Sequence, residues 1–143
     1  MSIARQKITT FLMFFGRAEE AMKFYTSLFD NSAILDIKKY GPGEAGTEGT
    51  VMHATFSLDG QQFMCIDTSA AQHGFTFTPA ISLYVTCTAE AEIDRLFEKL
   101  SVDGQVLMPL APYPFSPKFG WVADRFGVSW QLSLAMETGD TAA

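Results

Sequence analysis

The same order of predicted elements occurs twice along this chain, and this repetition constrains the fold more than any single motif. A β-prone run at 8–15 precedes a helical run at 18–29, and three further strand-like segments follow up to residue 67. The pattern begins again with a strand at 79–87, a helix at 89–100 and three more short strands. Shifting one half by about 71 residues places AEEAM over AEAEI, which is typical of an internal repeat. The order therefore predicts two tandem βαβββ modules.

Apolar spacing and turn chemistry support these elements. Each predicted helix carries one apolar stripe with the spacing of a helix that is buried on one side. Thr88 is the expected N-cap of the second helix, and Asp59-Gly60 between two strand-like runs is a strong hairpin signal. The stripes consist of Ala21, Met22, Tyr25, Leu28 and Phe29 in the first helix and Ile93, Leu96, Phe97 and Leu100 in the second.

The length of 143 residues and the hydrophobic content of 48% suit a single domain. A chain of this size buries about 68–70% of its unfolded surface, which is enough for one core without disulfide or metal cross-links. We expect the first module at about 8–67, a linker at 68–78 and the second module at about 79–135. The tail at 136–143 is expected to be disordered.

Charge and cysteine usage narrow the class of partner and the compartment. Ten Lys and Arg against sixteen Asp and Glu give a net charge of −6, which argues against binding of nucleic acid. Cys65 and Cys87 are isolated from each other, as reduced core residues of a cytoplasmic protein are. The N-terminal apolar run covers only Phe11 to Phe15, too short for a signal peptide or a membrane span. We therefore expect a soluble protein that binds neither membrane nor nucleic acid.

The last predicted strand, at 128–134, alternates cleanly between apolar and polar residues. Neighbouring residues of a strand point to opposite faces of the sheet, so this strand has one apolar face and one polar face. Val128, Trp130, Leu132 and Leu134 form the apolar face, whereas Ser129, Gln131 and Ser133 form the polar one.

Three stretches carry a resemblance to a known superfamily. The junctions FFGRAEEAMKFY and VTCTAEAEIDRLF, together with the closing DRFGVSWQLSL, resemble the vicinal oxygen chelate superfamily, which includes glyoxalase I. Within it, FLMFFGRAEEAMKFYTSLF and KFGWVADRFGVSWQLSL resemble the PhnB-like branch, often labelled demethylubiquinone methyltransferase-like. The resemblance spans about residues 8–135 and implies an α+β, glyoxalase-like fold. In that fold two βαβββ modules form curved sheets around a cavity, the helices lie outside, and a homodimer is common.

The resemblance also implies that the polar strand face lines a cavity for a small-molecule ligand. Three roles are open for Tyr84, namely an acid, a hydrogen-bond donor or part of the wall of this cavity. The Pro-rich segment at 107–121 either forms a lid over the ligand or tucks its aromatic residues onto the sheet edge. The predicted cavity residues are Thr10, Leu12, Phe14, Ser82, Tyr84, Tyr113, Phe115, Trp121, Ser129 and Gln131.

A metal site is the next implication, because glyoxalase-like members place His, Gln or Glu ligands on the first and last strands of both modules. The corresponding positions here are Thr10, or Phe11 if the strand register differs by one, then Cys65 or Asp67, then Ala80, and finally Gln131. Alanine has no ligand atom, and an amide oxygen lacks the charge that tightens a divalent site. A divalent metal is therefore disfavoured, and no other cofactor is expected.

Two histidines and one glycine motif are possible false leads. His53 lies within a predicted strand and is favoured as an ordinary sheet residue, with a general base as the alternative. His73 lies in the linker and is expected at the surface. The segment GPGEAG at 41–46 has the spacing of a dinucleotide fingerprint, but no helix is predicted to follow it, which indicates a loop.

The favoured function is the binding of a small organic molecule without a complete metal site, and whether the protein is an enzyme stays open. One alternative is a metal-dependent lyase, isomerase or oxygenase of the same superfamily. A second is a drug-sequestering protein of the resistance type. The methyltransferase label is doubted, because common S-adenosylmethionine enzymes use a doubly wound α/β sheet that this order of elements cannot build. Fold analogy alone does not choose among these functions.

Overall fold

The computed structural model describes residues 5–69 and 73–136 of the chain. The chain divides into two compact units, one ending at Thr76 and the other beginning at Phe77, within the segment predicted as a linker.

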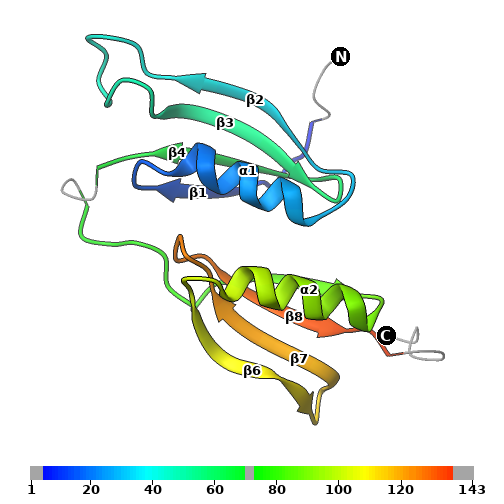
Figure 1. Ribbon diagram of the computed structural model, residues 1–143. Coiled ribbons are helices and arrows are strands. Elements are labelled where there is room, and N and C mark those ends of the chain that lie inside the picture. The colour runs from blue at the N-terminus through cyan, green and yellow to red at the C-terminus, as the bar shows by residue number, and fades with distance from the viewer. Residues whose placement is uncertain (1–4, 70–72, 137–143) are drawn as a thin grey trace. The chain divides into compact units, whose positions relative to one another are not determined.

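The first unit is a four-stranded sheet with one helix. Its sheet has the order β1-β4-β3-β2, in which β1 runs parallel to β4 and the other neighbours are antiparallel (Figure 1). Its elements are β1 (Thr10–Phe14), α1 (Ala18–Leu28), β2 (Ala33–Lys39), β3 (Val51–Leu58) and β4 (Gln61–Asp67).

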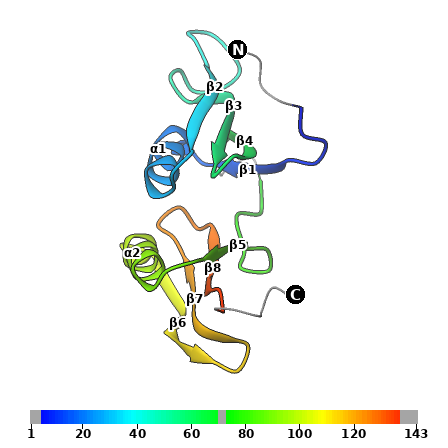
Figure 2. The ribbon, with the colours of Figure 1, turned by 90° about the vertical axis from the view of Figure 1, so that its right-hand side faces the viewer.

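The second unit repeats this topology. Its sheet has the order β5-β8-β7-β6, again with the first strand parallel to the last and the other pairs antiparallel. Figure 2 shows each helix on one face of its own sheet. Its elements are β5 (Leu83–Cys87), α2 (Glu90–Ser101), β6 (Gln105–Tyr113), β7 (Ser116–Ala123) and β8 (Ser129–Leu134). The predicted α+β fold with two βαβββ modules is therefore confirmed.

The apolar stripes of both helices form the cores of the two units. In α1 the ring of Tyr25 lies 6.5 Å from that of Phe14 in β1 and 6.4 Å from that of Phe56 in β3. In α2, Ile93, Leu96 and Leu100 are fully buried, and burial of apolar side chains is the main force that holds such layers together. Of the predicted stripe residues, Phe29 and Phe97 are only half-buried.

Turn chemistry accounts for the tightest connections. Asp59 and Gly60 both adopt positive φ, at 50° and 82°, between the antiparallel strands β3 and β4, which confirms the predicted hairpin. The glycine-rich segment at 41–49 is a loop between β2 and β3, as predicted. Its ends are joined by hydrogen bonds, from the Tyr40 N–H to the Thr50 carbonyl at 2.9 Å and from the Gly49 N–H to the Tyr40 carbonyl at 2.9 Å.

Two predicted boundaries were wrong. The strand expected from residue 79 begins only at Leu83, since Ile81 is 72% exposed and precedes the ladder with β8. The N-cap of α2 is Ala89 rather than Thr88, and it makes no side-chain hydrogen bond. The Glu92 carboxylate instead accepts a hydrogen bond from the Thr88 N–H at 2.9 Å. A carboxylate of the first helical turn thus binds a backbone N–H group just before the helix, as in a capping box.

The Pro-rich segment at 107–121 lies mostly within two strands of the second sheet. It forms most of a long hairpin, in which β6 and β7 are joined by only Pro114 and Phe115. Proline cannot donate to a ladder, so it is tolerated mainly on edge strands, and β6 is the edge of its sheet. The pairing of β6 with β7 is irregular around Pro109 and Pro112, where the register shifts on both sides of Ala111.

In the part of the chain that the structure describes, neither helix is long and apolar enough to cross a membrane.

Candidate functional site

The face of the second sheet that lies opposite α2 carries the polar residues of β8. Trp130 and Leu132 are buried on the α2 side, where a Cβ added to Gly120 would lie 2.5 Å from the Phe97 ring of α2. Gly120 is directly opposite Leu132 in the ladder, so both belong to the same face. The intervening residues Ser129, Gln131 and Ser133 therefore occupy the helix-free face. The alternation predicted for this strand is confirmed.

A row of side chains crosses three strands on this helix-free face. Gln131 of β8 is the register partner of Tyr84 in β5 and of Trp121 in β7. Directly opposite residues of paired strands have neighbouring side chains, so these three groups lie next to one another. Gln131 is half-buried, and Tyr84 is 58% exposed.

Hydrogen bonds join four of the predicted residues into a polar network of Ser82, Trp121, Ser129 and Gln131. The indole N–H of Trp121 donates to Ser129 Oγ at 2.8 Å. Ser129 Oγ lies 2.6 Å from Ser82 Oγ, and the Gln131 amide Nε2 donates to Ser82 Oγ at 3.3 Å. The structure thus brings together residues that are up to 49 positions apart in the sequence.

The remaining polar residue of β8 is used within the sheet. Ser133 Oγ lies 2.9 Å from Ser116 Oγ, and Ser116 also donates to the Lys118 carbonyl at 2.9 Å. Ser116 and Ser133 are both buried. These two hydroxyls therefore stabilise the β7–β8 pair.

Asp124 fixes the turn that precedes β8. Its Oδ1 accepts the N–H groups of Phe126 at 2.8 Å and Val128 at 3.1 Å, and its Oδ2 accepts the Trp130 indole N–H at 2.8 Å. Gly127 has a φ of 95°, which a glycine adopts without strain. This buried carboxylate sets the start of the strand that carries Ser129 and Gln131.

The aromatic residues of the Pro-rich hairpin pack on one another. The rings of Tyr113 and Phe115 stack at 5.7 Å, and Phe119 meets Phe115 edge-on at 4.9 Å. The Tyr113 hydroxyl donates to the Pro109 carbonyl at 2.7 Å, while Phe115 remains 62% exposed. This geometry corresponds to the alternative in which the aromatic residues lie against their own sheet.

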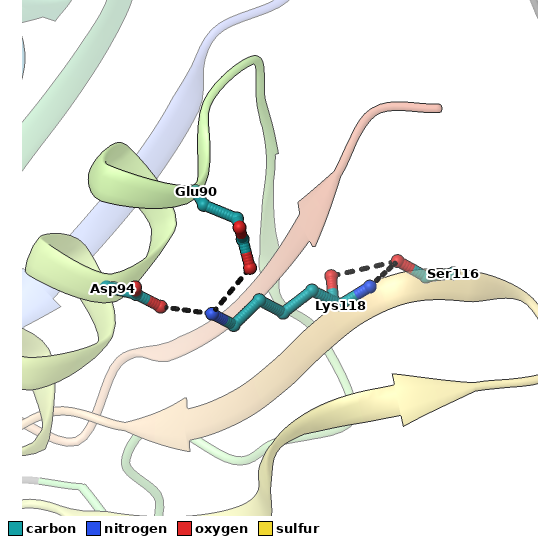
Figure 3. A network of polar contacts seen from close by, with 4 residues as sticks. All are labelled: Glu90, Asp94, Ser116 and Lys118. Carbon is teal, nitrogen blue, oxygen red and sulfur yellow. Dashed lines mark hydrogen bonds and ion pairs between the residues drawn. The ribbon is translucent and has the colours of Figure 1, made fainter. Parts of the chain in front are cut away.

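Lys118 faces the other way from the polar network. Its Nζ lies 2.6 Å from Asp94 and 3.2 Å from Glu90, both on α2 (Figure 3). The hydrogen bond to Asp94, followed by that to Glu90, raises the pKa of Lys118. The side chain of this cation is therefore engaged with the helix.

The predicted cavity residues of β1 lie on the side of the first sheet that α1 covers. Leu12 and Phe14 are buried on the face that α1 covers, so they do not line the helix-free face of the first sheet. Thr10 is exposed at the start of the strand, on the same side as Leu12. The residues that occupy the helix-free face are Phe11 and Met13. Because both faces of the strand TFLMF are largely apolar, its sequence did not indicate which face packs against the helix.

The two histidines occupy ordinary positions. His53 lies on the helix-free face of the first sheet, where its ring centre is 6.5 Å from that of Phe11. His73 has its Nε2 at 3.1 Å from Thr68 Oγ1 and its ring 5.1 Å from Phe75. None of these contacts places either histidine beside a second titratable group.

Asp67, a weak metal candidate, uses its carboxylate to hold the backbone. Oδ1 accepts the N–H groups of Gly16 at 2.8 Å and Ala18 at 2.9 Å, and Oδ2 accepts that of Val51 at 2.9 Å. The residue is buried. It therefore links β4 to the turn before α1 and to the start of β3.

The other donors weighed for a metal do not complete a site either. Cys65 is fully buried, and burial raises the pKa of its thiol to about 12, so it stays protonated at neutral pH. The Gln131 amide is turned towards Ser82. Among the residues that the structure describes, no three His, Cys, Asp or Glu side chains gather as a metal site requires. The donor set does not fit a divalent ion.

A pocket of about 550 Å³ lies within the first unit, and none of the ten predicted cavity residues lines it. One wall is the glycine-rich loop, where a Cβ on Gly46 would fall within 2.3 Å of the Tyr40 ring. Other walls are the end of β4 and the turn after β1, and the hydroxyl-bearing residues Thr47 and Thr50 face it as well. Sequence reasoning missed this pocket, although the cluster of glycines in one connection is a signal of close packing.

Known proteins resemble the chain over nearly its whole length. The family model of 3-demethylubiquinone-9 3-methyltransferase matches residues 6–133. The solved PhnB protein of Bacillus cereus is 66% identical, with a TM-score of 0.88 over 91% of this chain and 100% of that one. No functionally curated protein matches the sequence.

Two more distant solved structures share the fold. A glyoxalase-related enzyme from Fulvimarina pelagi has 19% identity and a TM-score of 0.56, over 91% of this chain and 89% of its own. The fosfomycin resistance protein FosX of Listeria monocytogenes has 9% identity and a TM-score of 0.65, over 94% of this chain and 97% of its own. Both matches show a glyoxalase-like fold. The chain belongs to the 3-demethylubiquinone-9 3-methyltransferase family, as its similarity to the PhnB protein also indicates.

Proposed function

We propose that the helix-free face of the second sheet binds a small, uncharged organic molecule. The observation that carries this proposal is the polar network of Ser82, Trp121, Ser129 and Gln131, four neutral side chains that join β7, β8 and the residue before β5 by hydrogen bonds. A few placed polar groups among apolar and aromatic side chains are the usual composition of a small-molecule site. Tyr84, which is 58% exposed beside Gln131, supplies aromatic surface.

The ligand is uncharged because the network offers no charge to pair with it. Burying an ion without a partner is costly, so a charged ligand needs an opposite charge at its site. The cation Lys118 of β7 lies on the opposite face of the sheet, where it is engaged with Asp94 and Glu90 of α2. A neutral ligand meets hydroxyl, amide and aromatic groups without this cost.

Metal-dependent catalysis and drug sequestration remain the alternatives. The first requires donors that Cys65, Asp67 and Gln131 do not provide together, as their contacts indicate. The second is suggested by the superfamily resemblance and by the fosfomycin resistance protein, which is 9% identical and shares the fold.

Methyl transfer, which the family's name describes, is not part of the proposal. The common fold of S-adenosylmethionine enzymes is a doubly wound parallel sheet, whereas each sheet here has one parallel pair and two antiparallel pairs. The motif GPGEAG, moreover, lies in a loop between two strands, so no helix follows it to receive a phosphate.

We also propose that the protein acts as a cytoplasmic homodimer. Both cysteines are free, as is usual in a reducing compartment. The resemblance to the superfamily, in which chains commonly pair, supports the dimer.

The test is a screen of uncharged fragments by ligand-observed NMR with wild type, Gln131→Ala and Thr47→Val. We expect Gln131→Ala to weaken the binding of the hits by about tenfold, the effect of one hydrogen bond lost to a partly buried partner. Thr47→Val is the matched control because it removes a hydroxyl from the pocket of the first unit. Hits that are lost in Thr47→Val and kept in Gln131→Ala would place binding in that pocket and refute the proposal.

A further inference from the structure

The direction of each hydrogen bond in the polar network can be assigned from its chemistry. An indole N–H only donates, so Ser129 Oγ accepts from Trp121 at 2.8 Å. Ser129 and Ser82 share one further bond at 2.6 Å, in which either hydroxyl can be the donor. The exposure of the two serines decides between these directions.

Ser129 is the donor in this shared bond. Its side chain is buried, with 2% of the residue exposed, and the described residues give its hydroxyl no other acceptor than Ser82. If Ser82 donated instead, the hydrogen of Ser129 would be buried without a partner, which is costly. Ser82 is half-buried and can turn its own hydrogen outwards. The bond therefore runs from Ser129 to Ser82.

Ser82 Oγ consequently accepts two hydrogen bonds, one from Ser129 and one from Gln131 Nε2 at 3.3 Å. A hydroxyl oxygen has two acceptor positions, so both are filled and its own hydrogen remains to donate. Because the Gln131 amide turns its NH₂ group to Ser82, its Oε1 has no hydrogen-bond partner among the described residues. The helix-free face thus presents the Ser82 hydroxyl as a donor beside Gln131 Oε1 as an acceptor.

We propose that this pair, the Ser82 hydroxyl and the Gln131 carbonyl oxygen, forms hydrogen bonds with the edge of a cis amide, as in a lactam or a lactam-like heterocycle. Such an edge presents a carbonyl oxygen next to an N–H, the complement of the donor and acceptor on the protein. Tyr84, the register partner of Gln131, places an exposed ring beside the pair for the flat face of the ligand. This assignment rests on the proposed function and adds the ligand class.

The donor and acceptor pair also predicts which ligands bind weakly at this site. A ligand with two adjacent carbonyl oxygens would bring one of them against Gln131 Oε1, where two acceptors face each other without a hydrogen. An amide whose nitrogen carries a methyl group loses the donor in the same way. Sites that hydrogen-bond a ligand group discriminate against analogues that lack it, since their own polar atoms are left unpaired.

The experiment compares 2-pyridone with N-methyl-2-pyridone, which has the same ring and carbonyl but no N–H. Backbone NMR titrations should show 2-pyridone shifting amides of β5 and β8 and N-methyl-2-pyridone binding at least about tenfold more weakly. Ser82→Ala should abolish binding of 2-pyridone. Thr86→Val, an exposed position of β5 on the same face but outside the network, should leave it unchanged.

Equal affinities for the two pyridones would overturn the amide-edge assignment, and this comparison needs no variant to fold. Retention of the preference in Ser82→Ala would overturn it as well. If screened uncharged fragments bind in a Gln131-dependent manner but the pyridones are not distinguished, the inference fails and the proposed function stands. If no uncharged compound perturbs β5 and β8, both fail.

Discussion

At the scale of single residues, the first unit depends on one buried carboxylate. Asp67 accepts three backbone N–H groups from Gly16, Ala18 and Val51, at 2.8 to 2.9 Å. Two of these donors precede or begin α1, where the N–H groups of the first helical turn have no partner within the helix. A residue that the sequence suggested as a metal donor therefore serves as a distant cap for the helix.

Asp67→Asn is expected to lower the free energy of unfolding by about 2 kcal/mol or more, because the amide turns an NH₂ group towards buried donors. The measurement is urea denaturation followed by circular dichroism. Asp36→Asn, the same change at an exposed position of β2, is the control and should have little effect. Equal midpoints for wild type and Asp67→Asn would contradict the role given to this carboxylate.

At the scale of the elements, the contact between the end of α2 and the turn after β7 leaves no room for a side chain. A Cβ on Gly104 would lie 2.3 Å from the Ala123 carbonyl oxygen and 3.2 Å from Asp124 Cα. Both are backbone atoms, so the helix and the turn would have to move apart. Asp124 in turn sets the start of β8, which connects this contact to the polar network.

Gly104→Ala should destabilise the protein by about 1–3 kcal/mol through this overlap. Thermal unfolding is the measurement, with Gly74→Ala as the control, because a Cβ on Gly74 meets nothing within 4 Å. The same melting temperature for both variants would show that the contact between α2 and the turn has room for a methyl group.

Elements with a single clear periodicity were predictable from the sequence. The stripes of α1 and α2 and the alternation of β8 were identified correctly because each has one polar and one apolar side. The strand β1 is apolar on both sides, so the face that packs against α1 was not assigned correctly from its sequence. Because of Pro109 and Pro112, the full length of the edge strand β6 was not predicted. Tertiary position decided both cases.

The candidate site was predictable only in its composition. Alternation placed Ser129 and Gln131 on one face, but their bonds to Ser82 and Trp121 depend on the register between β5, β7 and β8. The spacing of residues along the sequence does not indicate how these strands are aligned with one another. The commitment of Asp67 to backbone N–H groups and the pocket beside the glycine-rich loop likewise arise from long-range pairing.

At the scale of the whole molecule, each unit repeats one topology, but the two have different helix-free faces. The second face carries the neutral polar network, whereas the first carries Phe11, Met13 and His53. The central claim is that the protein uses the polar network to bind an uncharged organic molecule without a resident metal ion.

Native mass spectrometry of untagged protein, purified without chelators, tests this claim most directly. One spectrum reports the number of subunits, any bound divalent ion and any retained or added organic molecule, and the same measurement on Gln131→Ala is the control. We expect a metal-free dimer that carries an uncharged ligand from the screen in the wild type and loses it in Gln131→Ala. A stoichiometric divalent ion, or a ligand adduct that is undiminished in Gln131→Ala, would contradict the account.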